Sequence, residues 1–343
     1  MTERRAIVTG AGGFIGHHLV RRLKADGFWV RGVDLKYPEF EASAADEFFL
    51  LDLRRSAQCA EALARIGEAD IAVYHLAANT GGIAFIERHK ALITHDNVLI
   101  DTHLLEAARK AGVARFLFAS SACVYPAYLQ QDANVAPLRE GDAYPADPED
   151  GYGWEKLFAE RECRHYWEDY GLETRVARFH NVYGPLGAYA GGREKSPAAM
   201  CRKVAQAADG GEVEIWGDGA QTRSYCYVDD CVEGIRRLMD SEHRTPLNIG
   251  QERLVSIDEL VDIVAHVAGK RVVKRHIPGA LGVRGRTSDN SRLRAVLGWE
   301  PLTPLEEGLR HTYRWVADRI ATGSRDAAGI SGGHRDQPLA VTR

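Results

Sequence analysis

The sequence predicts an α/β fold built on a doubly wound parallel sheet, and two observations support this prediction. Short segments rich in β-branched residues alternate with longer segments of helical periodicity through the first half of the chain. The first of these strand-like segments runs directly into a glycine-rich turn and a helical pattern. Such alternation is typical of βαβ units, whose strands lie parallel. Ligands of these sheets bind beyond the carboxyl ends of the strands, so we expect functional residues in the loops that follow them.

Each strand and helix of the first half is predicted from its own local pattern. Strands are expected where apolar and β-branched residues form short runs, and helices where apolar residues recur at helical spacing. In chain order, we expect strands at 6–9, 29–34, 71–74, 115–120 and 174–179, and helices at 14–25, 97–110 and 152–170.

The pattern loosens after residue 181, which indicates a smaller lobe. A glycine-rich loop at 184–192 is followed by short helical segments, a strand at 212–216, and helices near 256–268 and 304–320. The last 22 residues are rich in Gly, Asp, Arg and Ser and lack periodicity, which favours a flexible tail. We therefore expect a first domain at 1–181 to which 225–250 returns, a smaller α/β C-terminal substrate lobe at 182–224 and 251–321, and a tail at 322–343.

Composition and charge exclude several classes of function. The chain has 343 residues, 45% apolar and 27% charged, which is ordinary for a globular protein with a sizeable core. Its 44 Lys and Arg against 48 Asp and Glu leave a net charge of -4. No global positive field therefore attracts nucleic acid or an anionic membrane, and we expect neither as a partner.

The cysteines and the N-terminal segment bear on metal binding and location. The six cysteines show no C-x2-C pair and no zinc-finger spacing to a histidine, so we expect no metal site. The first residues carry no apolar signal region, and no stretch of 18 apolar residues follows. We expect a cytoplasmic protein with reduced thiols.

The glycine-rich turn has the spacing of a dinucleotide site. Gly10, Gly13 and Gly16 allow the backbone to approach a diphosphate at the start of a helix, where free N–H groups favour negative charge. Asp34, 18 residues after Gly16, would accept hydrogen bonds from the ribose hydroxyls and repel a 2'-phosphate, which favours NAD over NADP. We expect a Rossmann-type domain that binds NAD through Gly10, Gly13, Phe14, Ile15, Gly16, Asp34, Lys36, Asp52, Tyr152 and Lys156.

Tyr152 and Lys156 lie four residues apart at the start of an expected helix, so phenol and ammonium share one face. A neighbouring cation favours the phenolate, which allows the tyrosine to accept a hydroxyl proton. The alternative is a buried aromatic residue beside a lysine whose stem covers apolar surface.

These motifs together resemble the extended short-chain dehydrogenases/reductases of the NAD-dependent epimerase/dehydratase family. The resemblance rests on the glycine turn, the segment Ser120-Ser-Ala-Cys-Val-Tyr-Pro126 and the Tyr152/Lys156 pair, and it implies that Ser121 joins that pair in catalysis. Longer segments at 118–126, 178–185, 191–198 and 283–290 are similar to the GDP-mannose 3,5-epimerases, and the likeness covers roughly residues 5 to 320.

The resemblance implies an isomerase that acts on a GDP-sugar. It would convert GDP-D-mannose to GDP-L-galactose by transient oxidation of C4 with bound NAD, inversion at C5 and C3, and re-reduction, with GDP-L-gulose as a side product when C5 alone is inverted. A C4 ketone makes both neighbouring C–H groups acidic, which is why one bound NAD serves two inversions. The resemblance also implies a homodimer paired through the helices at 97–110 and 152–170.

Inversion requires two proton-transfer groups on opposite faces of the sugar, and the family match assigns these roles to Cys123 and Lys195. On the residues alone, Cys123 could equally be a buried structural thiol, and Lys195 a solvated loop charge. Cys123 and Lys195 would thus also contact the substrate, and we expect Gly81, Asn181 and Glu194 to contact the sugar. Asn79-Thr80 stands where the family has Asp-Met, so this contact region departs from the pattern. Because a guanidinium binds phosphate oxygens bidentately, we expect the diphosphate to be held by basic residues, namely Lys203, Arg223, Arg284 and Arg286. The resemblance implies this role for Arg284 in particular.

Two other functions remain open from the sequence. One is an NAD-dependent nucleotide-sugar 4-epimerase, although such enzymes generally have no thiol at the position of Cys123. The other is a non-catalytic NAD-binding sensor, which would need neither Tyr152 nor Lys195. The related 4,6-dehydratases carry an Asp-Glu pair where this chain has Ala122-Cys123, and therefore fit less well.

Overall fold

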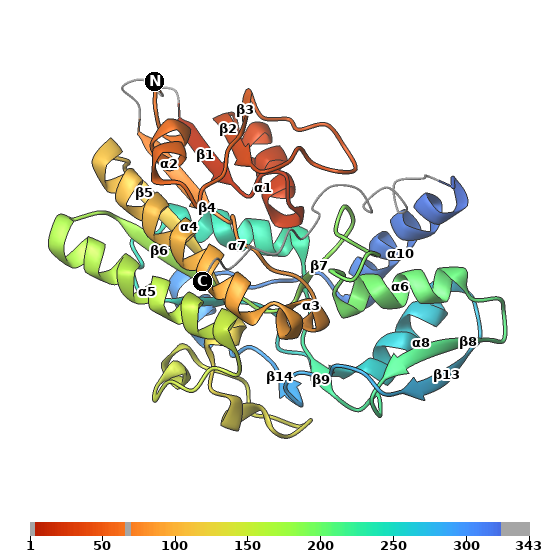
Figure 1. Ribbon diagram of the computed structural model, residues 1–343. Helices are drawn as coiled ribbons and strands as arrows, with labels where there is room; N and C mark the ends of the chain where they lie inside the picture. The colour runs from red at the N-terminus through yellow and green to blue at the C-terminus, as the bar shows by residue number, and fades with distance from the viewer. Residues whose placement is uncertain (1–3, 66–69, 324–343) are drawn as a thin grey trace, which may run out of the picture.

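The structure is a computed structural model that describes residues 4–65 and 70–323 (Figure 1). Its centre is a seven-stranded sheet in the order β11-β6-β5-β4-β1-β2-β3, and every neighbouring pair is parallel. This confirms the predicted doubly wound sheet. The strands are β1 (Arg5–Thr9), β2 (Trp29–Asp34), β3 (Glu47–Leu50), β4 (Ile71–His75), β5 (Arg115–Ser121), β6 (Thr174–Phe179) and β11 (Leu247–Ile249).

Helices cover both faces of the sheet because successive side chains of a buried strand point to opposite sides. In β1, Ala6 and Val8 belong to one apolar core, whereas Ile7 belongs to a second. The first core is covered by α1 (Phe14–Ala25) and α7 (Val228–Asp240), and the second by α2 (Ser56–Ala62), α4 (Lys90–Ala111) and α5 (Gly151–Tyr170).

Helix ends follow capping chemistry that the sequence contains. The Asp150 carboxylate caps α5 by accepting a hydrogen bond from the Gly153 N–H at 3.0 Å. The residues that cap the C-terminal ends of α5 and α4 are Gly171 and Gly112, both in the left-handed region with φ of 71° and 64°. Helix α4 begins at Lys90, seven residues before its expected start at 97. Residues 90–96 are not predicted as helical because their apolar residues, Ala91 to Ile93, are consecutive and do not recur at helical spacing.

The smaller lobe packs helices against two short sheets and occupies the lower right of Figure 1. Strand β8 (Gly211–Trp216) pairs in parallel with β13 (Val272–Ile277), while β9 (Thr222–Arg223) lies between β12 (Val255–Ser256) and β14 (Gly285–Arg286). The remaining elements are α3 (Ile83–Arg88), α6 (Ser196–Gln206), α8 (Ile257–Ala268), α9 (Ser291–Leu297), α10 (Leu305–Ala321), the parallel pair β7 (Val182–Tyr183) and β10 (Cys226–Tyr227), and the 3-10 helices η1 (Ala122–Val124), η2 (Ala127–Gln130) and η3 (Glu140–Ala143).

The segment 225–250, which contains α7 and β11, returns to the large sheet, where β11 pairs with β6. The first apolar core continues from the sheet into the lobe, where it includes Met200, Leu260 and Leu309. The division into two domains stays a prediction. The expected tail at 322–343 lies outside the described residues, except for its first two positions.

The described part of the chain contains neither a candidate membrane-spanning helix nor a candidate metal-binding cluster. None of its helices combines the length and apolar character needed to cross a bilayer. No cluster of three or more His, Cys, Asp or Glu residues in residues 4–65 and 70–323 is arranged to hold a metal ion.

Candidate active site

The glycine turn between β1 and α1 is built for close backbone contact. A Cβ atom on Gly16 would lie 2.1 Å from the Gly10 carbonyl oxygen, and one on Gly12 would lie 2.1 Å from the Lys36 carbonyl oxygen. Gly10 itself has a φ of +72°, which favours glycine. Helix α1 has neither a side-chain cap nor an acidic residue in its first turn. This N-terminus therefore fits an anionic group such as the diphosphate of a dinucleotide.

Asp34 lies at the end of β2 beside this turn. One carboxylate oxygen accepts the Gly12 N–H at 2.9 Å, and the other accepts the Lys36 N–H at 3.2 Å. Burial raises the pKa of Asp34, and the backbone N–H donors partly offset that rise. A carboxylate held in this way fits the ribose role expected from the sequence.

Lys36 and Asp52, which are also expected at the cofactor site, both form ion pairs with neighbouring side chains. The Lys36 ammonium is exposed and lies 3.5 Å from Glu39. Asp52, just after β3, pairs with the Arg54 guanidinium at 2.9 Å, and this hydrogen-bonded pair lowers the pKa of Asp52.

A cavity of about 590 Å³ lies where the carboxyl ends of β4, β5 and β6 meet the smaller lobe. It is lined from the sheet side by the loop after β4, by η1 and by the start of α5, and from the lobe side by α6 and the segments around β9 and β14. The expected residues that line it are Gly81, Ser121, Cys123, Tyr152, Asn181, Glu194, Lys195, Lys203 and Arg223.

Tyr152 reaches the cavity because α5 begins against the backbone of η1. A Cβ atom on Gly153 would lie 2.1 Å from the Cys123 carbonyl oxygen, so glycine is required there for this approach. Burial raises the pKa of the Tyr152 phenol above its usual range. The Lys156 charge and a side-chain hydrogen bond with Thr80 act in the opposite direction and favour the phenolate.

Lys156 lies outside the cavity lining and is 1% exposed. Its ammonium contacts the Asp101 carboxylate at 3.2 Å, the Glu155 carboxylate at 3.6 Å and the face of the Phe118 ring at 4.8 Å. Burial alone would lower the pKa of Lys156, but Asp101 and Glu155 raise it, and the net shift is upward. Lys156 is therefore a fixed cation, and its Nζ lies 5.9 Å from the centroid of the Tyr152 ring.

Cys123 lies in η1, directly after the strand that carries Ser121. The Ser121 hydroxyl accepts the Cys123 N–H at 3.2 Å and so caps this short helix. The Cys123 thiol lies 3.4 Å from the Arg286 guanidinium, which also donates to the Gln130 side chain. The thiol therefore faces a buried cation from β14.

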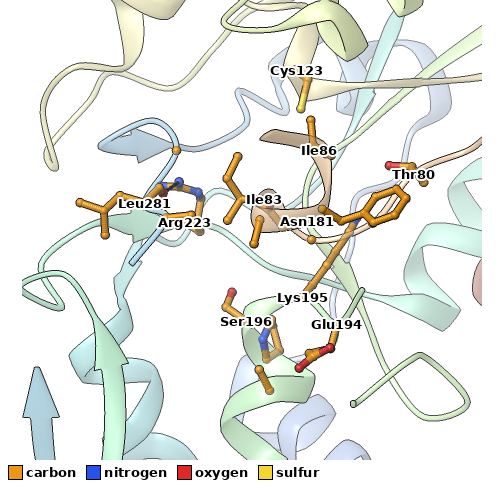
Figure 2. A pocket seen from close by; sticks show the side chains of 18 of the residues that line it. Thr80, Ile83, Ile86, Cys123, Asn181, Glu194, Lys195, Ser196, Arg223 and Leu281 are labelled. Atoms are coloured by element: carbon orange, nitrogen blue, oxygen red, sulfur yellow. Dashed lines mark hydrogen bonds between the residues drawn. The ribbon is translucent and has the colours of Figure 1, made fainter. Parts of the chain in front are cut away.

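Lys195 comes from the opposite wall of the same cavity, immediately before α6. Figure 2 shows its side chain pointing into the cavity from below, with Cys123 pointing in from above. Lys195 is accessible from the cavity, yet the surrounding walls desolvate its ammonium and lower the pKa of Lys195. The backbone before Lys195 lies against Gly82, whose N–H donates to the Arg193 carbonyl at 3.1 Å. A Cβ atom on Gly82 would lie 2.6 Å from the Glu194 carbonyl oxygen, so glycine allows this close backbone contact.

Asn181 and Glu194 are both held by hydrogen bonds at the edge of the cavity. Asn181 has a φ of +42° and donates from its side chain to the Ser224 carbonyl at 2.9 Å. Glu194 accepts the Gly192 N–H at 2.7 Å and pairs with Arg202 at 3.3 Å.

The basic residues expected to hold a diphosphate divide into two groups. Lys203 and Arg223 line the cavity and donate to backbone carbonyls, Lys203 to Glu214 at 2.7 Å and Arg223 to Val283 at 2.7 Å. Burial and the neighbouring Arg286 lower the pKa of Arg223 to about 10. Arg284 differs from the expectation because it is absent from the cavity lining, and its guanidinium forms a two-point pair with Asp218 at 2.7 and 2.8 Å.

Three residues of this region are not predicted from the sequence, namely Asp101, Glu149 and Glu155, and Thr80 is noted only as a departure from the family pattern. Glu149 lines the cavity, and burial raises its pKa against the pull of Arg286. Asp101 carried one usable signal, because it lies on the same helical face as Leu104 and Ala108, where a charge requires a partner. No local sequence pattern indicates that Thr80 contacts Tyr152 or that Glu155 contacts Asn97.

Comparisons with known proteins agree with this geometry. The family model described as "NAD dependent epimerase/dehydratase family" matches residues 6–250. The chain is 46% identical over 330 residues to GDP-mannose 3,5-epimerase 1 of Oryza sativa subsp. indica, a match that covers 96% of this chain and 85% of that protein.

Solved structures give the same picture. UDP-glucose 4-epimerase of Thermotoga maritima, solved with UDP-glucose, matches with a TM-score of 0.81 at 28% identity over 92% of this chain and 99% of the other. UDP-glucose 4-epimerase of Thermus thermophilus, solved in complex with NAD, matches with a TM-score of 0.79 at 27% identity, and the match covers 91% of this chain and 98% of the other. The predicted fold, family and cofactor are confirmed: the chain belongs to the NAD-dependent epimerase/dehydratase family.

Proposed function

We propose that this protein converts GDP-D-mannose to GDP-L-galactose by oxidising C4, inverting C5 and C3, and reducing C4 again. The observation that carries the proposal is that Cys123 and Lys195 enter one cavity from opposite walls (Figure 2). Tyr152 lines the same cavity. The 46% identity to a rice GDP-mannose 3,5-epimerase supports the choice of substrate. GDP-L-gulose is expected when only C5 is inverted.

NAD supplies reversible hydride acceptance at C4 when it is bound. The glycine turn at Gly10, Gly13 and Gly16, with Phe14 and Ile15 opening α1, fits its diphosphate, and Asp34 fits a ribose. Lys36 and Asp52 would lie at the outer end of that site.

Tyr152 is the proposed base and acid for the C4 hydroxyl. Its phenolate takes the hydroxyl proton as C4 becomes a ketone and returns it when C4 is reduced. Lys156 favours the phenolate through its charge, and Ser121, which also lines the cavity, donates a hydrogen bond to the C4 oxygen. The reaction has no net redox change.

Cys123 and Lys195 are the proposed pair for inversion. The C4 ketone makes the hydrogens at C3 and C5 acidic, and inversion requires removal of a proton from one ring face and delivery to the other. The Arg286 guanidinium lies 3.4 Å from the Cys123 sulfur, which places a cation beside the group proposed as the base. Desolvation lowers the pKa of Lys195, which makes its ammonium a better proton donor.

The proposed contacts to the nucleotide sugar follow from the same cavity. Gly81, Asn181 and Glu194 lie where they would meet the sugar, and Lys203 and Arg223 where they would meet the diphosphate. Arg284 would join them by exchanging the Asp218 carboxylate for a phosphate, because a guanidinium binds both bidentately.

The proposal extends to the assembly and the compartment. A homodimer through α4 and α5 is supported by large apolar side chains exposed on these helices, with Leu92 at 48%, Trp154 at 48% and Phe158 at 50%. A second copy of the chain is the proposed occupant of this face. The cytoplasm is the proposed compartment, because all six cysteines are unpaired.

Incubation with GDP-mannose in deuterated water, without added cofactor, tests the proposed function. We expect deuterium at both C3 and C5 of the recovered sugar nucleotide, together with GDP-L-galactose. Inversion at C4 alone, with no label at C3 or C5, would instead identify a 4-epimerase. A protein that binds GDP-mannose and NAD but neither labels nor inverts the sugar would be a sensor, and the proposal would be wrong.

A further inference from the structure

A buried cluster of ionisable groups surrounds the Lys156 ammonium. Asp101 from α4 lies 3.2 Å from this nitrogen, and Glu155 from α5 lies 3.6 Å from it. The side chains of Lys156, Asp101 and Glu155 are 1%, 3% and 0% exposed. Two carboxylates therefore face one ammonium in a site that solvent does not reach.

The hydrogen bonds of the two carboxylates differ. Asp101 is satisfied on both oxygens, with His75 Nε2 at 2.9 Å on one and Lys156 on the other. Glu155 accepts the Asn97 side-chain amide at 2.7 Å on Oε1. Its Oε2 lies 3.6 Å from the Lys156 nitrogen, beyond hydrogen-bond distance, and is buried without a hydrogen-bond partner among the described residues. An ionised carboxylate oxygen without a donor is costly in such a place. A proton on Glu155 removes that charge and provides a donor for Asp101, with which it is in side-chain hydrogen-bonding reach.

The charge of this cluster acts on Tyr152. The titratable groups that face Glu155 are Lys156 and Tyr152 on its own helix and Asp101 on α4, with His75 of β4 behind Asp101. If both carboxylates were ionised, the cluster would carry a net negative charge and oppose a phenolate at Tyr152. With one proton between them the cluster is neutral, and the ammonium can favour the phenolate.

We propose that Asp101 and Glu155 hold a single proton between them beside Lys156, and that this proton makes Glu155 a positioning residue for proton transfer by Tyr152. Burial raises the pKa of Glu155 to about 8, although Lys156 opposes the rise. The proton is therefore present at neutral pH and lost on the alkaline side. Its loss would leave the cluster with a net negative charge, which opposes the phenolate and slows proton transfer.

The kinetic test compares pH profiles of the holoenzyme, and this part rests on the proposed function. We expect wild-type kcat to fall as pH rises through the Glu155 titration, by about tenfold for each pH unit beyond it. Glu155→Gln keeps a neutral donor and acceptor, so its activity near pH 7 should stay within about threefold of wild type while the alkaline limb moves upward by about one pH unit or more. Identical profiles for wild type and Glu155→Gln would overturn the proposal.

Glu162→Gln is the matched control. Glu162 also lies on α5, and burial raises its pKa as well, but its carboxylate binds the Thr102 hydroxyl at 2.9 Å. This variant should keep the wild-type profile. An upward shift equal to that of Glu155→Gln would show a general effect of charge on α5 and would contradict a specific role for Glu155.

An infrared titration of the resting holoenzyme needs no sugar and separates this inference from the proposed function. We expect wild type and Glu162→Gln to lose a protonated-carboxyl carbonyl band between about pH 7 and about pH 9.5, and Glu155→Gln to lack that component. Equal difference spectra for wild type and Glu155→Gln would show that Glu155 holds no proton, whatever reaction the enzyme performs. A positive titration combined with failed deuterium labelling would leave this inference standing and refute only the proposed function.

Discussion

Tyr152 and Lys156 lie one helical turn apart, yet their side chains meet different surroundings. Tyr152 lines the cavity, whereas Lys156 is 1% exposed and bound to Asp101. The phenol can therefore meet a substrate hydroxyl directly, and the ammonium acts only through its charge. One proton transfer therefore uses both residues, because Tyr152 exchanges the proton and Lys156 supplies the charge that favours the phenolate.

Tyr152→Phe removes the phenolic oxygen and keeps the ring. We predict a fall in kcat of about 10²-fold to 10⁴-fold, with NAD retention and GDP-mannose affinity close to wild type. Steady-state kinetics and the NAD content of the purified protein measure this. A phenylalanine variant that keeps more than about a tenth of the wild-type kcat would refute the assignment.

Cys123→Ala removes one of the two proposed groups for inversion. We predict that deuterium uptake at C3 and C5 falls by about 10²-fold to 10⁴-fold, measured by NMR of the recovered sugar nucleotide. Cys59→Ala is the control, because Cys59 is buried in α2 within the second core and does not line the cavity. Equal uptake by the two variants would exclude the thiol from the reaction.

The stability of the protein should also report on Glu155. The unfolded chain loses this proton near the ordinary pKa of 4.5, whereas the folded protein keeps it to about 8. The folded state thus binds more protons in this window, and the contribution of Glu155 to the free energy of unfolding falls as pH rises, by up to about 1.4 kcal/mol per pH unit.

Urea unfolding of wild type and Glu155→Gln at several pH values isolates this contribution. We predict that the variant gains stability relative to wild type from pH 5 towards pH 8, and that the difference becomes constant above that window. A difference that does not depend on pH would mean that Glu155 titrates alike in the folded and unfolded states.

At the scale of elements, the contact between α5 and η1 determines where Tyr152 and Cys123 meet. The Cβ atom introduced by Gly153→Ala would lie 2.1 Å from the Cys123 carbonyl oxygen, so one of the two elements must move. Alanine favours a helix by at most about 1 kcal/mol over glycine, whereas such overpacking costs about 1 to 3 kcal/mol, so the clash should prevail.

We therefore predict that Gly153→Ala lowers both stability and kcat, as measured by thermal unfolding and steady-state kinetics. Gly141→Ala is the matched control, because a Cβ atom at that position in η3 meets nothing within 4 Å. If the two alanine variants behave alike, the close approach of α5 to η1 does not position the site.

Elements with strong local patterns could be predicted from the sequence, and elements that depend on tertiary pairing could not. Strand β6 and helix α1 have the bounds that their apolar patterns indicate. Strand β11 has only three residues, Leu247–Ile249, and exists because it pairs with β6. Its formation depends on a tertiary contact that no local pattern expresses.

The candidate site divides in the same way. Tyr152 and Cys123 carry motifs and could be found from the sequence. Asp101 and Glu155 become partners only because α4 packs against α5. Arg284 and Arg286 share one motif, and only the structure shows that Arg286 contacts the thiol while Arg284 pairs with Asp218.

For the whole molecule, the cavity combines groups from the large sheet and the smaller lobe. Cys123 follows β5 of the sheet, whereas Lys195 precedes α6 of the lobe. One continuous apolar core joins the two parts. The proposed chemistry therefore requires the lobe to stay packed on the sheet.

Assembly can be tested on the exposed face of α5. We predict that Phe158→Glu shifts the protein from dimer to monomer in sedimentation experiments, because the side chain is 50% exposed and the proposed interface would bury the new charge. Val273→Glu, at a 55% exposed position on β13, should leave the dimer intact. A wild-type protein that is monomeric at all concentrations would remove the basis for this interface.

The central claim is that C4 is oxidised and then reduced within one cavity. The most direct test follows GDP-mannose that carries deuterium at C4 through turnover in ordinary water, without added cofactor. We predict GDP-L-galactose that keeps the deuterium at C4, together with slower turnover than for unlabelled substrate. Release of the label to solvent, or inversion at C3 and C5 at an unchanged rate with no isotope effect at any stage, would contradict the account.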